Sequence, residues 1–132
     1  ENCEEMNFTY SGLSGEVIIP SKCKIFKAQY CKNLDRFTGG ENCEEMDFNY
    51  SGLSGKVIIP SLCKKFEARE CKNLTSFTGG ENCEEMDFNW LELSGEVIIP
   101  SLCKKFYAKK CENLTGFIGG EKCIIINSAC YK

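Results

Sequence analysis

The sequence predicts a right-handed β-solenoid of about six turns, each about twenty residues long, with parallel strands and almost no helix. Three observations lead to this prediction. The stretch LSGEVIIP at residues 13–20 returns at 53–60 and 93–100 with only one charge changed. A cysteine recurs every twenty residues from Cys3 to Cys123. After each of these cysteines, small or apolar residues follow at the spacing of a strand with one inward face.

The chain is expected to form a single repeat domain, residues 1–132. Three forty-residue units, 1–40, 41–80 and 81–120, precede a divergent partial coil at 121–132. Helical repeats fit poorly, because each unit carries Gly-Gly, Ser-Gly, a proline and the β-favouring run VIIP. A propeller is disfavoured as well, since it needs about four blades or more. The forty-residue unit therefore divides best into two coils.

Each coil is expected to begin with a short strand around positions three to eight, counting its first cysteine as position one. These are predicted to be the only regular strands. Their ranges are 5–10, 25–30, 45–50, 65–70, 85–90 and 105–110. In the partial coil the same count places Ile126 at position four, where the other coils carry Met or Phe.

The stretch LSGEVIIP is expected to be the return arm of the coil. Leu13 turns inward and Gly15 permits a bend. Ile18 or Ile19 packs against the core, and Pro20 ends the arm. Such a coil cannot bury its apolar edge alone, so the coils are expected to stack.

The coils alternate in type, and the alternation is complementary. Position six carries Phe in one coil and Ala in the next, so large and small side chains share the space between turns. Position two alternates in charge, which penalises a slip of the stack by one coil. The charged row consists of Glu4, Lys24, Glu44, Lys64, Glu84 and Lys104.

The stretch CEEMDFNYSGLSGKVIIP at 43–60 resembles the plant-type leucine-rich repeat, L-x-x-L-x-L-x-x-N-x-L-x-G-x-I-P. CKKFEARECKNLTSF at 63–77 is similar to the cysteine-containing type, L-x-x-L-x-L-x-x-C-x-x-L. The resemblance covers nearly the whole chain, as six coils and a stub. Cys replaces the first Leu, and Ser replaces the Asn of the plant-type pattern. The resemblance implies a solenoid with a concave face made of strands.

Eleven cysteines in 132 residues are typical of an oxidised, secreted protein. A zinc site is disfavoured, because the chain has no histidine and no C-x-x-C. Stacking places the position-one cysteines in a column about 5 Å apart, where disulfides and buried free thiols are both consistent alternatives. The column consists of Cys3, Cys23, Cys43, Cys63, Cys83, Cys103 and Cys123. Cys31, Cys71 and Cys111 lie about 10 Å from one another and are expected to stay thiols.

Four N-x-[ST] sequons support the secreted interpretation and predict N-linked glycans. Asn73 and Asn113 are expected on the turn that leaves the strand. Asn49 and Asn7 are expected at outward strand positions, with Asn7 close to the N-terminal edge.

Aromatic residues stand at position eight of four coils. They are Tyr10, Tyr30, Tyr50 and Trp90. Such a row could bind a sugar or a protein, or it could simply pack over the coil below it. The sequence leaves both alternatives open.

Other kinds of site find little support. The absence of histidine excludes Ser-His-Asp and Cys-His nucleophiles, so we expect no enzyme, no cofactor and no metal. A net charge of −3 disfavours nucleic acid, and no apolar run is long enough to span a membrane.

The leading functional hypothesis is a non-enzymatic, extracellular structural or adhesive repeat protein, glycosylated and assembling end to end into a fibre. The chain starts at Glu1, which favours a processed chain or a fragment. Few residues precede Cys3, and the partial coil adds Ile124 and Ile125, so both ends are expected to be apolar and to stack on other copies. The alternative is a receptor or inhibitor fragment that binds protein or glycan through the concave strand face.

Overall fold

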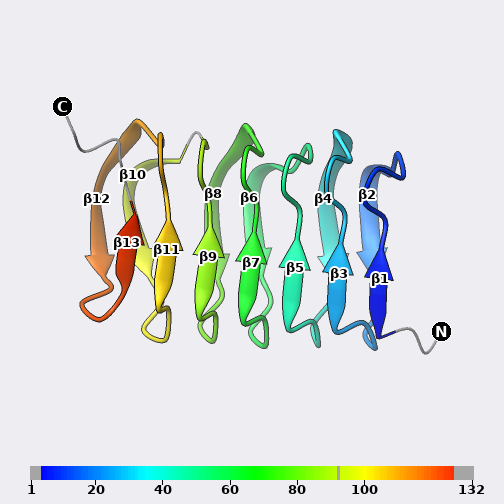
Figure 1. Ribbon diagram of the computed structural model, residues 1–132, viewed down its shortest axis with the longest axis horizontal. Coiled ribbons are helices and arrows are strands. Elements are labelled where there is room, and N and C mark those ends of the chain that lie inside the picture. Colours follow the sequence, from blue (N-terminus) through cyan, green and yellow to red (C-terminus); the bar gives the residue numbers. More distant parts are fainter. Residues whose placement is uncertain (1–3, 92, 127–132) are drawn as a thin grey trace.

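The computed structural model describes residues 4–91 and 93–126, which contain thirteen strands and no helix (Figure 1). Each complete turn carries a three-residue strand on one side and a strand of six or seven residues on the other. The short strands are β1 (Glu5–Asn7), β3 (Ile25–Lys27), β5 (Glu45–Asp47), β7 (Lys65–Glu67), β9 (Glu85–Asp87), β11 (Lys105–Tyr107) and β13 (Ile124–Ile126). The long strands are β2 (Ser14–Ile19), β4 (Asn33–Gly39), β6 (Ser54–Ile59), β8 (Asn73–Gly79), β10 (Ser94–Ile99) and β12 (Asn113–Gly119).

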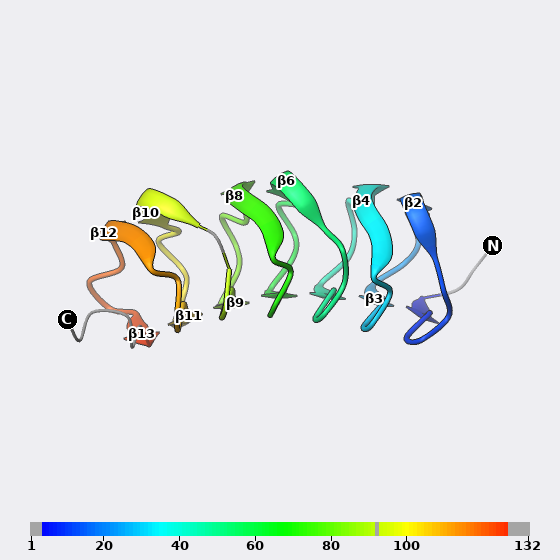
Figure 2. The same cartoon turned by 90° about the horizontal axis from the view of Figure 1, so that it is seen from above.

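All strand pairs are parallel, but the two sides of the solenoid differ in continuity. The short strands form one seven-stranded sheet in the order β1-β3-β5-β7-β9-β11-β13, and Phe26 lies opposite Met46 in it. The long strands form three separate outer strand pairs, β2–β4, β6–β8 and β10–β12. Each outer pair joins the two coils of one forty-residue unit. Figure 2 shows the stack gently arched, with the seven-stranded sheet on the concave side.

The predicted solenoid of about six turns, with twenty-residue coils, parallel strands and no helix, is confirmed. The prediction that the only regular strands lie around positions three to eight is wrong. Those strands are shorter than expected, and the return arms are strands as well. In β2, Ile18 is 75% exposed whereas Ile19 is only 2% exposed, so the arm alternates as a strand does. The β-branched run VII favours this conformation once the next coil offers a parallel partner.

The partial coil also differs from the prediction. Phe106 lies opposite Ile125 rather than Ile126, so β13 is shifted by one residue relative to the other short strands. Three consecutive isoleucines carry no polar residue that would mark the outward face, and the sequence pattern therefore does not fix the register. The shift leaves Ile124 exposed on the outward side.

The core is a stack of apolar columns between the two sides. Phenylalanine rings follow one another from coil to coil, all buried except Phe8 in the first coil, and successive ring centroids lie 5.6 to 6.0 Å apart. Phe48 lies between coils that carry Ala28 and Ala68, so the predicted sharing of space between large and small side chains is confirmed. Phe37 from β4 stacks on Phe48 at 4.9 Å and ties the outer strand to this row. Each buried ring stabilises the fold by about 1.5–3 kcal/mol.

Candidate functional site

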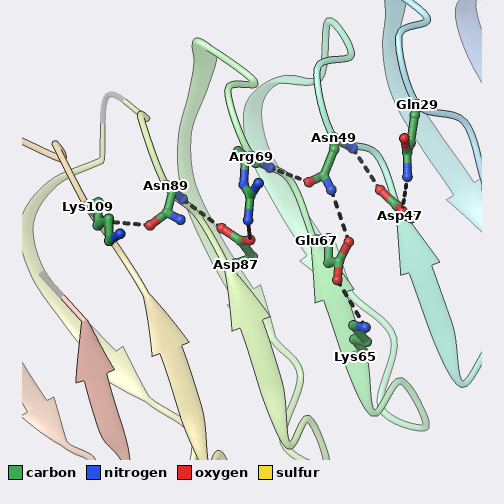
Figure 3. Close-up of polar contacts among 9 residues, drawn as sticks. All are labelled: Gln29, Asp47, Asn49, Lys65, Glu67, Arg69, Asp87, Asn89 and Lys109. Carbon is green, nitrogen blue, oxygen red and sulfur yellow. Dashed lines mark hydrogen bonds and ion pairs between the residues drawn. The ribbon is translucent and has the colours of Figure 1, made fainter.

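The outward face of the seven-stranded sheet carries a chain of polar contacts centred on Asn49 (Figure 3). Its Oδ1 accepts a hydrogen bond from the backbone N–H of Arg69 at 2.7 Å, and its Nδ2 donates to Glu67 at 3.0 Å. Asp47 accepts from the backbone N–H of Asn49 at 3.1 Å and from the side chain of Gln29. The Asn49 side chain therefore binds the backbone of the following coil, while its backbone N–H binds the carboxylate of Asp47 in its own coil.

The same arrangement repeats in the next unit. Asp87 accepts from the backbone N–H of Asn89 at 3.1 Å and from the guanidinium of Arg69 at 2.8 Å. The Oδ1 of Asn89 accepts from the backbone N–H of Lys109 at 2.7 Å. This network was not predicted from the sequence, although the repeated Asp-Phe-Asn at positions five to seven is a signal for it. Asp47, Asn49, Asp87 and Asn89 are buried in it, which is unusual for these residue types.

Charges within the network influence one another. Burial raises the pKa of Glu67, and the nearby carboxylate of Asp47 raises it further, while Lys65 opposes the shift from 3.2 Å. The hydrogen bond to Asp87 raises the pKa of Arg69. The Nε of Arg69 is buried without an acceptor among the described residues.

The predicted aromatic row forms along one edge of the solenoid. Tyr10, Tyr30 and Tyr50 stack with centroids 4.6 and 4.7 Å apart and planes 5° and 6° from parallel. Partial burial in this stack raises the pKa of Tyr30, and the flanking phenols add to the shift. The stacked rings cover each other's faces, so the row presents ring edges and hydroxyl groups. Tyr10 at the end of the stack is 73% exposed, and the face turned away from Tyr30 is open within the described residues.

Trp90 stands apart from the tyrosines, because Glu70 occupies position eight of the coil between them. The ammonium of Lys110 lies 5.8 Å from the centre of the Trp90 ring, which is a cation–π contact. Position eight adopts a left-handed backbone in all six coils, with φ between 59° and 67°. These residues are Tyr10, Tyr30, Tyr50, Glu70, Trp90 and Lys110. Bulky side chains rarely adopt this conformation, so the stack holds each of them in a strained turn.

The cysteine column lies inside the solenoid. The nine described cysteines have free thiols, whereas Cys3 and Cys130 lie outside the described residues. The described members of the column are buried, except for Cys123, which is half-buried. They are Cys23, Cys43, Cys63, Cys83, Cys103 and Cys123.

The thiols of the cysteines at position nine form different hydrogen bonds from those of the column. Cys71 donates to the carbonyl oxygen of Phe48 at 3.0 Å, and Cys31 and Cys111 make the equivalent bond in their coils. These thiols also lie near serine hydroxyls where serine is present, as for Ser51 at 3.4 Å from Cys71. They act as small polar groups that satisfy backbone carbonyls.

The four sequon asparagines lie in different surroundings. Asn73 and Asn113 are exposed and begin β8 and β12, rather than lying on a turn. Asn7 is exposed on β1, where its Oδ1 accepts from the backbone N–H of Thr9 at 3.0 Å. Asn49 is only 9% exposed, and its Nδ2, the atom that would carry a glycan, is bonded to Glu67.

A shallow groove of about 430 Å³ lies where the outer strands β8 and β10 fail to pair. Its apolar lining includes Phe77 and Val97. At the preceding junction, where β4 and β6 are neighbours, the two backbones lie so close that a Cβ on Gly52 would overlap the carbonyl oxygen of Lys32. The third unit has Glu92 in place of this glycine, outside the described residues.

Among residues 4–91 and 93–126, no three His, Cys, Asp or Glu side chains are grouped as metal ligands would be. The same residues include no helix with the length and hydrophobicity of a membrane span. No protein-family model, curated protein or solved structure matches this chain.

Proposed function

We propose that this chain is a non-enzymatic, extracellular structural or adhesive element whose solenoids stack end to end. The observation that carries this proposal is the edge geometry of the seven-stranded sheet. β1 and β13 are its two edge strands and lie at opposite ends of the stack (Figure 1). An edge strand offers a row of backbone groups with which another copy can pair.

Side chains at the two ends of the solenoid are apolar and partly exposed, as stacking requires. Met6 and Phe8 pack on the core at one end, and Ile125 does so at the other, but all three are only partly buried. They continue the same columns that are fully buried in the middle coils. The ring face of Tyr10 that is turned away from Tyr30 adds to the apolar surface at the β1 end of the stack. A second copy would bury these groups as one coil buries the next.

The proposal includes the finer assignment to leucine-rich repeats. The strand on the concave side and the buried Leu53 and Ile59 of the return arm support it. The arm departs from that family's pattern, because Gly55 and Pro60 are separated by two more residues than in G-x-I-P. The longer arm is the segment that forms the outer strands.

Secretion and glycosylation are the remaining parts of the proposal. The number of cysteines and the exposed sequon residues Asn7, Asn73 and Asn113 support them. The exposed asparagines lie on three different coils, and a glycan there would extend into water. Glycans spaced along the sides would leave the two ends open to stacking.

Sedimentation of the unglycosylated chain at micromolar concentrations tests the stacking. We expect oligomers that grow with concentration. Glu5→Pro should reduce the chain to monomers. The carbonyl oxygen of Glu4 and the N–H of Phe8 form hydrogen bonds to the coil that carries β3. Because backbone groups alternate between the two sides of a strand, the N–H of Glu5 faces the open side of β1. Proline there removes a donor that only another copy would use.

A second variant separates stacking from side-by-side association. Ile58 is 69% exposed on the outer face, in a row with Ile18 and Ile98. Ile58→Lys should assemble like the unmodified chain if the ends are used. A stable monomer before any substitution would overturn the proposal. Assembly that is lost in Ile58→Lys but kept in Glu5→Pro would overturn it too.

A ligand-recognition module is the second candidate, and the polar network favours it. The network fixes charged groups on the concave face, and the Arg69 Nε there has no acceptor among the described residues. A protein or glycan oxygen could supply one. A glycan array probed with the chain and with Arg69→Lys tests this candidate, which predicts binding that the variant loses. Absence of binding by the unmodified chain would count against the glycan form of the proposal.

A further inference from the structure

The third forty-residue unit departs from the second at a group of neighbouring positions. At 90–92 it reads Trp-Leu-Glu where the second unit has Tyr-Ser-Gly, which is the longest run of consecutive differences between the two. Lys110 stands where the second unit has Glu70, and the two differ in charge. Glu112 stands where the second unit has Lys72, again with the charge reversed. An array that otherwise copies itself has changed these residues.

The changed residues meet at a shallow hollow of about 370 Å³ on the edge of the solenoid that carries the aromatic row. It is lined by Lys72, Trp90, Leu91, Lys110 and Glu112. Four of these five differ from their counterparts in the second unit, and only Lys72 repeats an earlier residue, Lys32. Cavities that hold small ligands measure about 300–1,000 Å³. The set of side chains that lines this hollow occurs once in the array.

The indole of Trp90 gives the hollow an accessible apolar surface. Trp90 is 45% exposed, and no aromatic ring stacks on it within residues 4–91 and 93–126, whereas the tyrosines of the row stack on one another. Its backbone N–H donates to the carbonyl oxygen of Lys109 at 2.7 Å, and the next residue, Leu91, is buried in the core. The ring is therefore carried by a fixed turn. Because the face of an indole is electron-rich, it attracts the polarised C–H groups of a saturated ring.

The charged groups of the hollow are available to a ligand. Lys72 and Glu112 form no salt bridge with any residue that the structure describes. The ammonium of Lys110 lies 5.8 Å from the centre of the Trp90 ring, so an anionic group placed over the ring would lie beside it. Two ammonium groups against one carboxylate favour an acidic ligand, and hydrogen bonds between ions are the strong ones.

We propose that this hollow binds a hexuronate, the carboxylated sugar of acidic polysaccharides. The C–H face of the sugar ring packs on the indole of Trp90. The sugar carboxylate accepts hydrogen bonds from the ammonium groups of Lys72 and Lys110, and a sugar hydroxyl donates to the carboxylate of Glu112. An acidic peptide would satisfy the lysines but offers the indole no saturated ring.

This binding site requires neither the ends of the solenoid nor Arg69, which does not line the hollow. It is therefore separate from end-to-end stacking and from recognition through the polar network. Each of the three can fail without the others.

Fluorescence reports on the site directly, because Trp90 is the only tryptophan of the chain. The full chain is titrated with trigalacturonate, with its fully methyl-esterified and hence neutral form, and with triglutamate. Calorimetry of the same mixtures counts the sites. We expect a saturable change in fluorescence with trigalacturonate and one sugar chain bound per protein chain. Binding of the ester and of the peptide should be weaker by about tenfold or more.

Matched lysine variants locate the sugar. Lys72→Gln should weaken the binding of trigalacturonate by about tenfold, because it removes one ammonium from the hollow. Lys32→Gln changes a lysine that is also exposed and stands at the same position of the preceding unit, and it should bind like the unmodified chain. Arg69→Lys should also leave the affinity unchanged.

Several results would overturn the proposal. Equal affinity for trigalacturonate and its ester would remove the role of the lysines, and triglutamate binding as tightly as the sugar would make the ligand a peptide. Equal weakening in Lys72→Gln and Lys32→Gln, or loss of binding in Arg69→Lys, would place the sugar elsewhere. More than one sugar chain per protein chain would show a periodic surface instead of one site. Trigalacturonate that changes neither the fluorescence nor the heat of mixing would leave the hollow without this ligand.

Discussion

At the scale of single residues, asparagine joins coil to coil on the concave face. Asn49 and Asn89 each bind the backbone of the following coil. The sequence pattern identifies Asn49 only as a sequon, because N-x-[ST] does not show what surrounds the side chain. The outward position of Asn49 was predictable, but its burial was not. Burial depends on Glu67 and Arg69, which come from the next turn.

Occupancy of the sequons should follow this difference. Expressed through a secretory pathway, the chain should carry glycans on Asn73 and Asn113, which are exposed, and far less on Asn49, whose Nδ2 is bonded inside the fold. Intact mass before and after deglycosylation, with site mapping by peptide mass, measures this. Equal occupancy of Asn49 and Asn73 would contradict the expectation, and an unchanged mass would remove the glycans altogether.

Gly52→Ala should destabilise the fold, because the added Cβ would overlap the carbonyl oxygen of Lys32. We expect a loss of about 1–3 kcal/mol in the free energy of unfolding. Gly116→Ala is the matched control, since its Cβ would meet nothing closer than the side chain of Glu96 at 4.0 Å, and it should stay within about 0.5 kcal/mol. Urea midpoints measure both. Equal midpoints would show that the backbones at Gly52 can separate freely.

Glu67→Gln should change how stability depends on pH. The pKa of Glu67 is raised in the folded chain, so its contribution to stability is present below the unfolded value and lost as pH rises through the raised one. Glutamine keeps an acceptor for Asn49 but cannot ionise. The variant should therefore gain stability relative to the unmodified chain as pH rises above about 4.3.

Urea unfolding at low and at neutral pH measures the stability of the Glu67→Gln variant relative to the unmodified chain. Glu16→Gln controls for the loss of one negative charge at an exposed pair, where Arg36 lies 3.7 Å away on the outer side. A difference between Glu67→Gln and the unmodified chain that stays constant with pH would show that the carboxyl group does not titrate differently on folding.

At the scale of elements, the short strands were predictable and the long ones were not. Position four is apolar in every complete coil, so the inward face of the short strands is visible in the sequence. The return arm reads GEVIIP, whose three adjacent apolar residues hide the alternation. The arm becomes a strand only when β4 of the following coil pairs with β2. Ile18 then points outward and Ile19 points into the core. The coupling between coils is thus tertiary information.

The alternation along β6 can be tested with two neighbouring residues. Ile59→Ala should lower the free energy of unfolding by about 2–5 kcal/mol, because its side chain is only 2% exposed and leaves a cavity. Ile58→Ala removes the same atoms from an exposed position and should change stability by about 0.5 kcal/mol or less. Similar losses from both variants would mean that the arm is not a strand with two faces.

At the scale of the whole molecule, repetition made the architecture predictable, whereas the phase of its contacts was not. The twenty-residue cysteine spacing gave the coil and the forty-residue unit gave two coil types. Nothing in that spacing tells that the outer strands pair only within units, as β2 does with β4 and β6 does with β8.

The pairing of outer strands within units also governs how such a gene can change length. Inserting or deleting a single coil would leave one long strand without its partner, and would place Phe against Phe and Glu against Glu at the new joint. Inserting or deleting two coils restores every contact, because the array repeats after forty residues. Recombination that preserves the fold therefore proceeds in steps of forty residues. Near identity between units makes misaligned exchange of that length easy.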